Sequence, residues 1–173
     1  LSEPESHDEL LFIIIHQTYE LWFRQILHEL DATISWIKEG RLFRANHSLR
    51  VVTSIERILV SQIHILETMA PIGFLEFREK LYPASGFQSM QFREIEFVSG
   101  LKDERLLESF RDDQFAYDRL QSRLAEPSLA DAFWDAIGRS GFDVSDEQAR
   151  IRAIVEVLRQ NEKLGDLFIM QDL

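Results

Sequence analysis

The chain has 173 residues and a formal charge of -11, and 45% of its residues are hydrophobic. This length and composition are typical of one globular domain that buries roughly 70% of the surface of its unfolded chain. The excess of acidic residues disfavours binding to nucleic acid or an anionic membrane. The absence of cysteine excludes disulfides and thiolate chemistry. The longest apolar run, 10–15, is too short to cross a bilayer. We therefore expect a cytoplasmic protein that acts on small molecules or proteins.

Two long amphipathic helices are predicted at the beginning of the chain. Ser6 and Glu9 form the S-x-x-E pattern of a capping box, and apolar residues then recur at helical spacing as far as Gly40. A second helix is predicted over about 42–69, and Pro71 ends it because proline cannot continue a helix. These two helices would form the long axis of the fold.

Shorter helices are predicted in the remainder, because no period-2 strand pattern stands out there. The stretch "YPASGFQS" (82–89) has the composition of a turn. The fold class is therefore all-α, a helical bundle with two long N-terminal helices, short helices and connecting loops in a single domain over residues 1–173. The shorter helices are expected at 73–81, 90–99, 103–124 and 126–141, and from a capping-box pattern at Ser145 and Gln148 to about Phe168.

The spacing of the histidines argues against two classes of metal site. A zinc protease needs H-E-x-x-H, but Ala32 stands where the second histidine would follow His28. A carboxylate-bridged di-iron bundle needs E-x-x-H, and no histidine in the sequence has glutamate three residues before it. The sequence also lacks a G-x-S-x-G elbow, a P-loop and G-x-G-x-x-G.

His16 shares one helical face with aromatic residues. Phe12, Tyr19, Glu20 and Phe23 lie at i-4, i+3, i+4 and i+7 from it. Burial favours a neutral imidazole, which has one donor and one acceptor nitrogen and could meet the N–H of a planar aromatic ligand. A buried histidine bonded to Glu20 or to a backbone carbonyl remains the alternative.

Arg78 lies in the short helix "FLEFREKL", among apolar residues that include Phe74 and Phe77. Its guanidinium is suited to bidentate binding of a carboxylate. The alternative is a surface pair with Glu76 or Glu79. Aromatic walls, one imidazole and one guanidinium together suit an aromatic amino acid.

Two segments carry a family resemblance. "FIIIHQTYELW" resembles the F-I-x-x-H-Q-x-x-E-L-W signature of tryptophan 2,3-dioxygenases, and "FREKLYPASGFQSMQFREIE" resembles their F-R-x-x-L-x-P-x-S-G-F-Q-S-x-Q-[FY]-R signature. "EPSLADAF" is similar more weakly. The match covers most of the chain and is nearly identical at about 8–30 and 77–97.

The resemblance implies a haem enzyme that inserts O2 across the indole C2–C3 bond of L-tryptophan. The product is N-formylkynurenine, in the first step of tryptophan catabolism through kynurenine. Haem b, with its iron, would be the cofactor, L-tryptophan and O2 the substrates, and the assembly a cytoplasmic homotetramer. A haem dioxygenase for a different indole remains an alternative, as does a catalytically silent helical interaction module if the chain is the whole polypeptide.

The resemblance also implies roles for individual residues. His16 would be the catalytic distal histidine that hydrogen-bonds the indole N–H. Arg78 would bind the substrate carboxylate, and Phe12 would line the indole pocket. Phe74 would form part of the pocket wall, at a position where some family members have tyrosine, and it supplies no hydroxyl.

The resemblance also implies which residues lie near the oxygen site of the haem and where the ligand of its iron is found. Ser85 and Gly86 would face the distal side of the haem near the oxygen site. No residue of this chain matches the family's proximal histidine, which is expected in a further C-terminal segment, and the family's N-terminal segment is also absent. We therefore expect an incomplete part of a longer enzyme that is inactive by itself.

Overall fold

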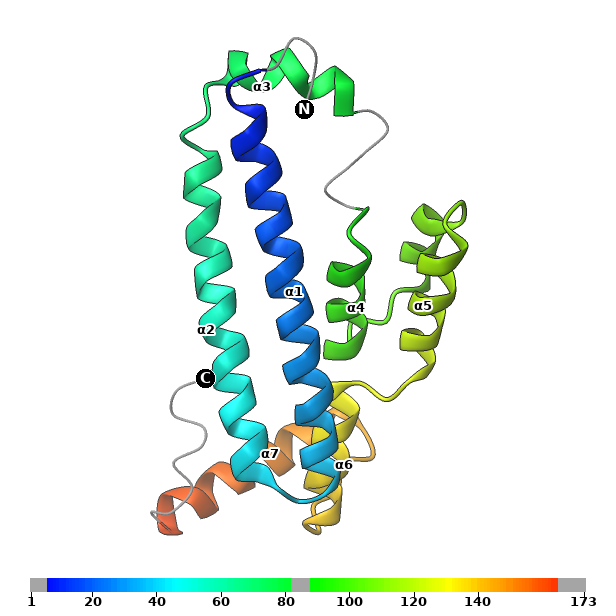
Figure 1. The fold of residues 1–173 in the computed structure, drawn as a ribbon. Helices are drawn as coiled ribbons and strands as arrows, with labels where there is room; N and C mark the ends of the chain where they lie inside the picture. Colours follow the sequence, from blue (N-terminus) through cyan, green and yellow to red (C-terminus); the bar gives the residue numbers. More distant parts are fainter. Residues whose placement is uncertain (1–5, 82–87, 165–173) are drawn as a thin grey trace.

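The computed structural model describes residues 6–81 and 88–164, and the side chains within these ranges as far as residue 160. The described residues form helices and no strand, which confirms the all-α class. Helices α1 (Glu9–Lys38) and α2 (Leu42–Leu66) make a long antiparallel hairpin (Figure 1). The prediction of two long N-terminal helices is confirmed, and the single-domain assignment stays a prediction.

The other helices are arranged along this hairpin. The first short helix crosses the end of the hairpin where α1 begins, two others lie to one side of α1, and the last two lie at the opposite end (Figure 1). Their bounds are α3 Pro71–Arg78, η1 Glu79–Leu81, α4 Met90–Ser99, η3 Glu104–Phe110, α5 Gln114–Ala125, α6 Leu129–Arg139 and α7 Glu147–Leu164.

The main core lies between the second half of α1 and the part of α2 from Ala45 to Leu59. Val98 of α4 and Ala132 of α6 complete it, so α1 is packed on several sides. A smaller cluster joins α4 to η3 and α5. The buried residues of the main cluster are Ile26, Leu27, Leu30, Ile34, Ile37, Ala45, Val52, Ile55, Leu59, Val98 and Ala132.

The capping box predicted at the start of α1 is wrong. Asp8 occupies the N-cap position without a side-chain cap, and the Ser6 hydroxyl instead donates to Glu76 Oε2 of α3 at 3.0 Å. A capping box does form at α6, between Ser128 and Asp131. The hydrogen bonds from Ser128 hold the pKa of the Asp131 carboxyl below its usual value.

The single helix predicted over 103–124 is also wrong, because two aspartates start separate segments. Asp103 accepts from the backbone N–H of Arg105 and begins the 3-10 segment η3, and Asp113 accepts from the N–H of Ala116 and begins α5. Aspartate side chains compete with the helical backbone in this way.

The last helix begins differently from its prediction. Asp146, rather than Ser145, caps α7 by accepting from the N–H of Ala149 at 2.7 Å. The predicted extension to Phe168 lies outside the described residues.

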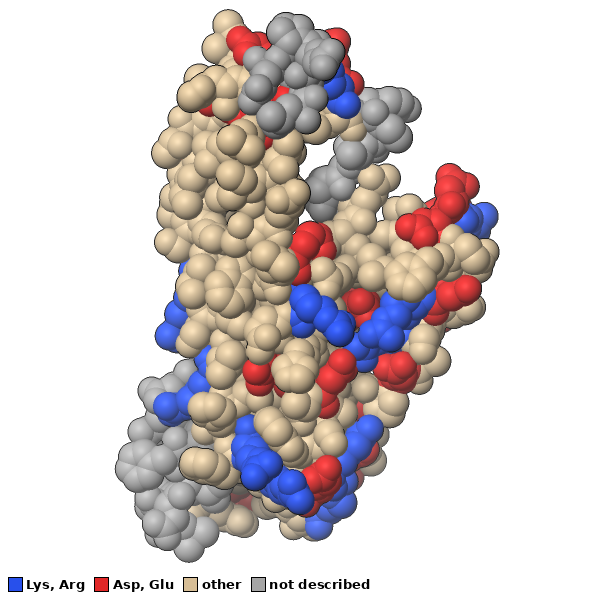
Figure 2. Space-filling view, viewed as in Figure 1, with Lys and Arg blue, Asp and Glu red and all other residues tan. Residues whose placement is uncertain are grey.

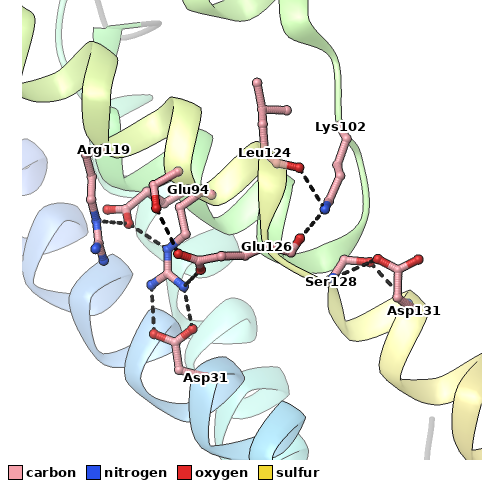
Figure 3. A network of polar contacts seen from close by, with 10 residues as sticks. Asp31, Glu94, Lys102, Arg119, Leu124, Glu126, Ser128 and Asp131 are labelled. Carbon is pink, nitrogen blue, oxygen red and sulfur yellow. Dashed lines mark hydrogen bonds and ion pairs between the residues drawn. The ribbon is translucent and has the colours of Figure 1, made fainter.

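Buried charges join α5 to α1 and α4. The Arg123 guanidinium, only 7% exposed, donates two hydrogen bonds of 2.7 Å to Asp31 and one of 3.0 Å to Glu94 (Figure 3). Glu94 is 2% exposed and also accepts from Arg119. These bonds, those to Asp31 foremost, raise the pKa of Arg123. Removing one member of such a buried set leaves an uncompensated charge.

Within the described residues, no single helix is long and apolar enough to cross a membrane. The pair formed by Leu42–Leu66 and Pro71–Leu81 meets that test only jointly, by length and composition, across a bend of 94°.

Replacing Arg123 by alanine should lower the free energy of unfolding by about 3 kcal/mol, because the buried Glu94 would lose one of its two arginine partners. Urea titration followed by circular dichroism measures this loss. Arg105→Ala is the matched control, since Arg105 pairs with Asp103 while 89% exposed, and its loss should change stability far less. Equal losses in the two variants would contradict a structural role for the buried network.

Candidate functional site

His16 lies two turns into α1 and is half-buried. Its Nδ1 is 2.8 Å from the backbone carbonyl oxygen of Phe12. A carbonyl can only accept, so Nδ1 carries the proton and donates, and Nε2 of the neutral ring is an acceptor. Of the two alternatives for a buried histidine, the bond to a backbone carbonyl is confirmed. The described residues show no bond between His16 and Glu20, whose carboxylate accepts from Gln91 of α4.

An aromatic cluster surrounds this imidazole. The Phe12 ring centroid lies 4.0 Å from that of His16, 5.8 Å from that of Phe74 and 5.5 Å from that of Phe77. Phe74 and Phe77 meet edge to face at 5.4 Å, and Phe77 is 0% exposed. Tilted and edge-to-face ring pairs of this kind stabilise packing beyond area burial. The cluster therefore joins α1 to α3 and forms an apolar wall beside His16.

Arg78 is the last residue of α3 and lies beside the Phe74 ring. Its Cζ lies 5.8 Å from the centroid of the Phe74 ring, within the range of a cation–π contact. The alternative pair with Glu76 or Glu79 is absent among the ion pairs of the described residues. The guanidinium is exposed and can bind an anionic group from solution.

Two further contacts hold α3 against the start of α1, and neither was predicted from the sequence. One is the bond between Ser6 and Glu76 described above. The other is a close approach at Gly73, where an added Cβ would lie 2.2 Å from Asp8 Oδ2. A glycine inside the short helical segment "PIGFLEFR" was the available signal, since such a glycine often marks close packing.

Tyr19 lies one turn after His16 on α1, and its side chain links α1 to α2. Its hydroxyl donates to the Leu59 carbonyl of α2 at 2.5 Å, and burial raises its pKa. Phe23, one turn further on, contacts the Tyr19 ring edge to face and the Phe92 ring of α4 at 5.5 Å. These residues fix the segment that carries His16 against α2 and α4.

The structure thus brings four of the predicted site residues into one connected cluster. They are Phe12, His16, Phe74 and Arg78. Ser85 and Gly86 lie outside the described residues. The roles of all six stay predictions at this point.

The cluster offers limited means of holding a metal or cofactor. The described residues contain no group of three His, Asp or Glu side chains that could hold a metal ion. The other four histidines are all exposed; they are His7, His28, His47 and His64. The rings beside His16 offer apolar surface to a cofactor, and its Nε2 can accept a hydrogen bond or ligate a single metal.

Comparison with known proteins gives a family match. The family model for tryptophan 2,3-dioxygenase matches residues 1–142. The chain is 54% identical over 157 residues to the tryptophan 2,3-dioxygenase of Nocardioides sp., 47% over 147 residues to that of Herpetosiphon aurantiacus, and 46% over 144 residues to that of Rhodococcus jostii. These names do not favour a catalytically silent module.

The same alignments show how much of each protein is compared. They cover 88%, 85% and 83% of this chain, and 58%, 56% and 51% of the three relatives. The chain spans about half the length of the curated relatives it matches.

Replacing the buried Phe77 by alanine should remove the centre of the aromatic cluster and cost about 3–5 kcal/mol of the free energy of unfolding. Chemical denaturation measures the loss. Phe115→Ala is the control, because Phe115 is 74% exposed and its truncation should change stability by less than about 0.5 kcal/mol. A Phe77→Ala protein as stable as the control would mean that α3 does not depend on this cluster.

Proposed function

Since the chain belongs to the tryptophan 2,3-dioxygenase family, we propose that the protein inserts both atoms of O2 across the C2–C3 bond of the indole of L-tryptophan and releases N-formylkynurenine. This reaction would be the first step of tryptophan catabolism through kynurenine. The observation that carries the proposal is the cluster that joins His16, the phenylalanine rings and Arg78.

The imidazole would orient the indole ring. With the proton on Nδ1 engaged by the Phe12 carbonyl, Nε2 of neutral His16 needs a donor, and the indole N–H is one. The rings of Phe12 and Phe74 offer apolar and aromatic surface for the indole. An indole N–H is a very weak acid, so His16 would act by orienting the ring through this hydrogen bond.

Arg78 would bind the α-carboxylate of the same molecule. A guanidinium presents two parallel N–H groups to a carboxylate, which fixes direction as well as distance. Held at both ends, tryptophan loses rotational freedom before the reaction, and this contributes to the rate.

Enzymes of this family are haem-dependent, and we propose haem b as the cofactor of the full protein. When bound, haem supplies the oxygen chemistry, whereas the residues of this chain bind tryptophan and orient it. We assign no histidine of this chain as the ligand of the haem iron; the histidines other than His16 lie apart from the cluster and are exposed. Ser85 and Gly86 are proposed to border the oxygen side.

We further propose a cytoplasmic homotetramer. Large apolar side chains are exposed on α1, α2 and α3, among them Leu21 at 73%, Val60 at 63% and Ile72 at 73%. In Figure 2, the surface over the part of α1 and α2 nearest α3 shows few charged residues. Such a surface favours association, and light scattering on the full-length protein would give the mass of four chains if the proposal holds.

Removing the guanidinium should weaken the transition state for tryptophan. In the full-length enzyme, Arg78→Ala should lower kcat/KM for L-tryptophan at least about a hundredfold, at ~1.4 kcal/mol per decade, because a charge-assisted clamp is lost. Arg44→Ala is the matched control, since Arg44 is also exposed and its Cζ lies 6.0 Å from the Trp36 ring centroid. Unchanged kinetics in Arg78→Ala would exclude the carboxylate role.

The hydrogen bond from the indole can be tested with 1-methyltryptophan, whose ring nitrogen has no proton. His16→Ala should reduce the preference for tryptophan over this analogue by about tenfold, the worth of one hydrogen bond. Steady-state kinetics with both substrates measure the ratio, and His28→Ala, a change at an exposed histidine of α1, should leave it unchanged. Equal losses for the two substrates in His16→Ala would show that His16 does not act through the N–H.

A further inference from the structure

The two residues proposed to hold the ends of the substrate belong to different helices. His16 is part of α1, whereas Arg78 ends α3, a helix of eight residues that follows α2. In Figure 1, α3 crosses the end of the hairpin instead of lying along it. The separation between the imidazole and the guanidinium therefore depends on how α3 is fixed to the beginning of α1.

One hydrogen bond links α3 to the residues just before α1. Ser6 Oγ donates to Glu76 Oε2 at 3.0 Å, across 70 residues of sequence. Ser6 is only 6% exposed, and its carbonyl accepts from the Glu9 N–H at 3.2 Å, so Ser6 is fixed to the first turn of α1. Glu76 stands two residues before Arg78 on α3. The bond thus joins the beginning of the helix that carries His16 to the helix that carries Arg78.

The other contacts of α3 with α1 are of a different kind. Phe74 and Phe77 pack against Phe12 as rings, and Gly73 lies against Asp8. Ring packing tolerates small rotations, whereas a hydrogen bond prefers a narrow range of distance and angle. The Ser6–Glu76 bond is therefore suited to fix the rotation of α3, which determines where Arg78 points.

Glu76 itself is an exposed residue. Water can solvate a carboxylate at such a position, so loss of the bond would not leave a buried charge without a partner. The bond also holds the carboxylate at the α1 side of α3. A directional contact two residues from Arg78, whose loss leaves no buried charge, favours a positioning role over a structural one.

Resting on the proposed function, we infer that Ser6 and Glu76 are positioning residues that set the place of Arg78 relative to His16. They thereby determine how strongly the site prefers an indole that carries a carboxylate. Neither residue touches the substrate. Their loss should weaken recognition of the carboxylate and leave recognition of the indole ring in place.

The test compares two ligands that differ only in this group, indole-3-propionate and indole-3-propionamide. Calorimetric titration of the full-length holoenzyme gives the ratio of their dissociation constants, amide over acid, for each variant. Ser6→Ala should lower this ratio at least fivefold, toward its value in Arg78→Ala. Ser6→Thr keeps the hydroxyl and should restore the ratio to within twofold of wild type.

Variants at the acceptor separate the hydrogen bond from charge. Glu76→Gln keeps an acceptor oxygen and should retain the ratio, whereas Glu76→Ala lacks both charge and acceptor and should lower the ratio as Ser6→Ala does. Glu79→Gln removes a charge beside Arg78 at a residue that does not bond to Ser6, and should leave the ratio within twofold of wild type. Glu76 is exposed, so Glu76→Ala carries the test if Ser6→Ala does not fold.

A ratio within twofold of wild type in both Ser6→Ala and Glu76→Ala would overturn the inference, including the case in which both ligands bind more weakly to the same degree. Failure of the proposed function gives a different result. In that case the wild-type ratio would be close to one, or Arg78→Ala would leave it unchanged.

Discussion

The packing of α3 across the start of α1 is the constraint on which the candidate site depends. Each helix alone carries half of the arrangement, with His16 and Phe12 on α1 and Phe74 and Arg78 on α3. The rings of Phe12, Phe74 and Phe77 hold the halves together, and Gly73 leaves room for the Asp8 side chain at the start of α1. A change at this junction would disturb the site while leaving the core of the hairpin intact.

Stability and ligand binding are concentrated at different ends of α1. The main core begins at Ile26 and continues to Ile37, and the buried network of Arg123 and Glu94 joins α1 through Asp31 (Figure 3). The first half of α1 holds the half-buried residues Phe12 and His16. Elements with fewer buried contacts open at lower free energy, so the well-packed half can hold α1 in place while the other half binds a ligand.

Much of this arrangement could be predicted from local sequence. The long apolar repeats predicted α1 and α2. The i-4 spacing placed Phe12 beside His16, and Arg78 was expected among apolar residues that include Phe74; the ring contacts confirm both. The prediction failed where a single side chain decides a local structure. Asp113 begins a new helix inside a stretch whose amphipathic pattern continues through it.

Other features depend on contacts between distant parts of the chain. The partner of Ser6 is 70 residues away, so the S-x-x-E pattern gave the wrong partner for its hydroxyl. In the sequence, Glu94 and Arg123 are two charged residues with no sign that they will pair, and they become buried only when α4 and α5 pack together.

The central claim is that His16 and Arg78 hold the two ends of one tryptophan molecule. The most direct measurement is a crystal structure of the full-length protein with L-tryptophan bound. It should place the indole nitrogen and the carboxylate each about 3 Å from a nitrogen of His16 and of Arg78, respectively. Tryptophan bound away from either side chain would contradict the claim.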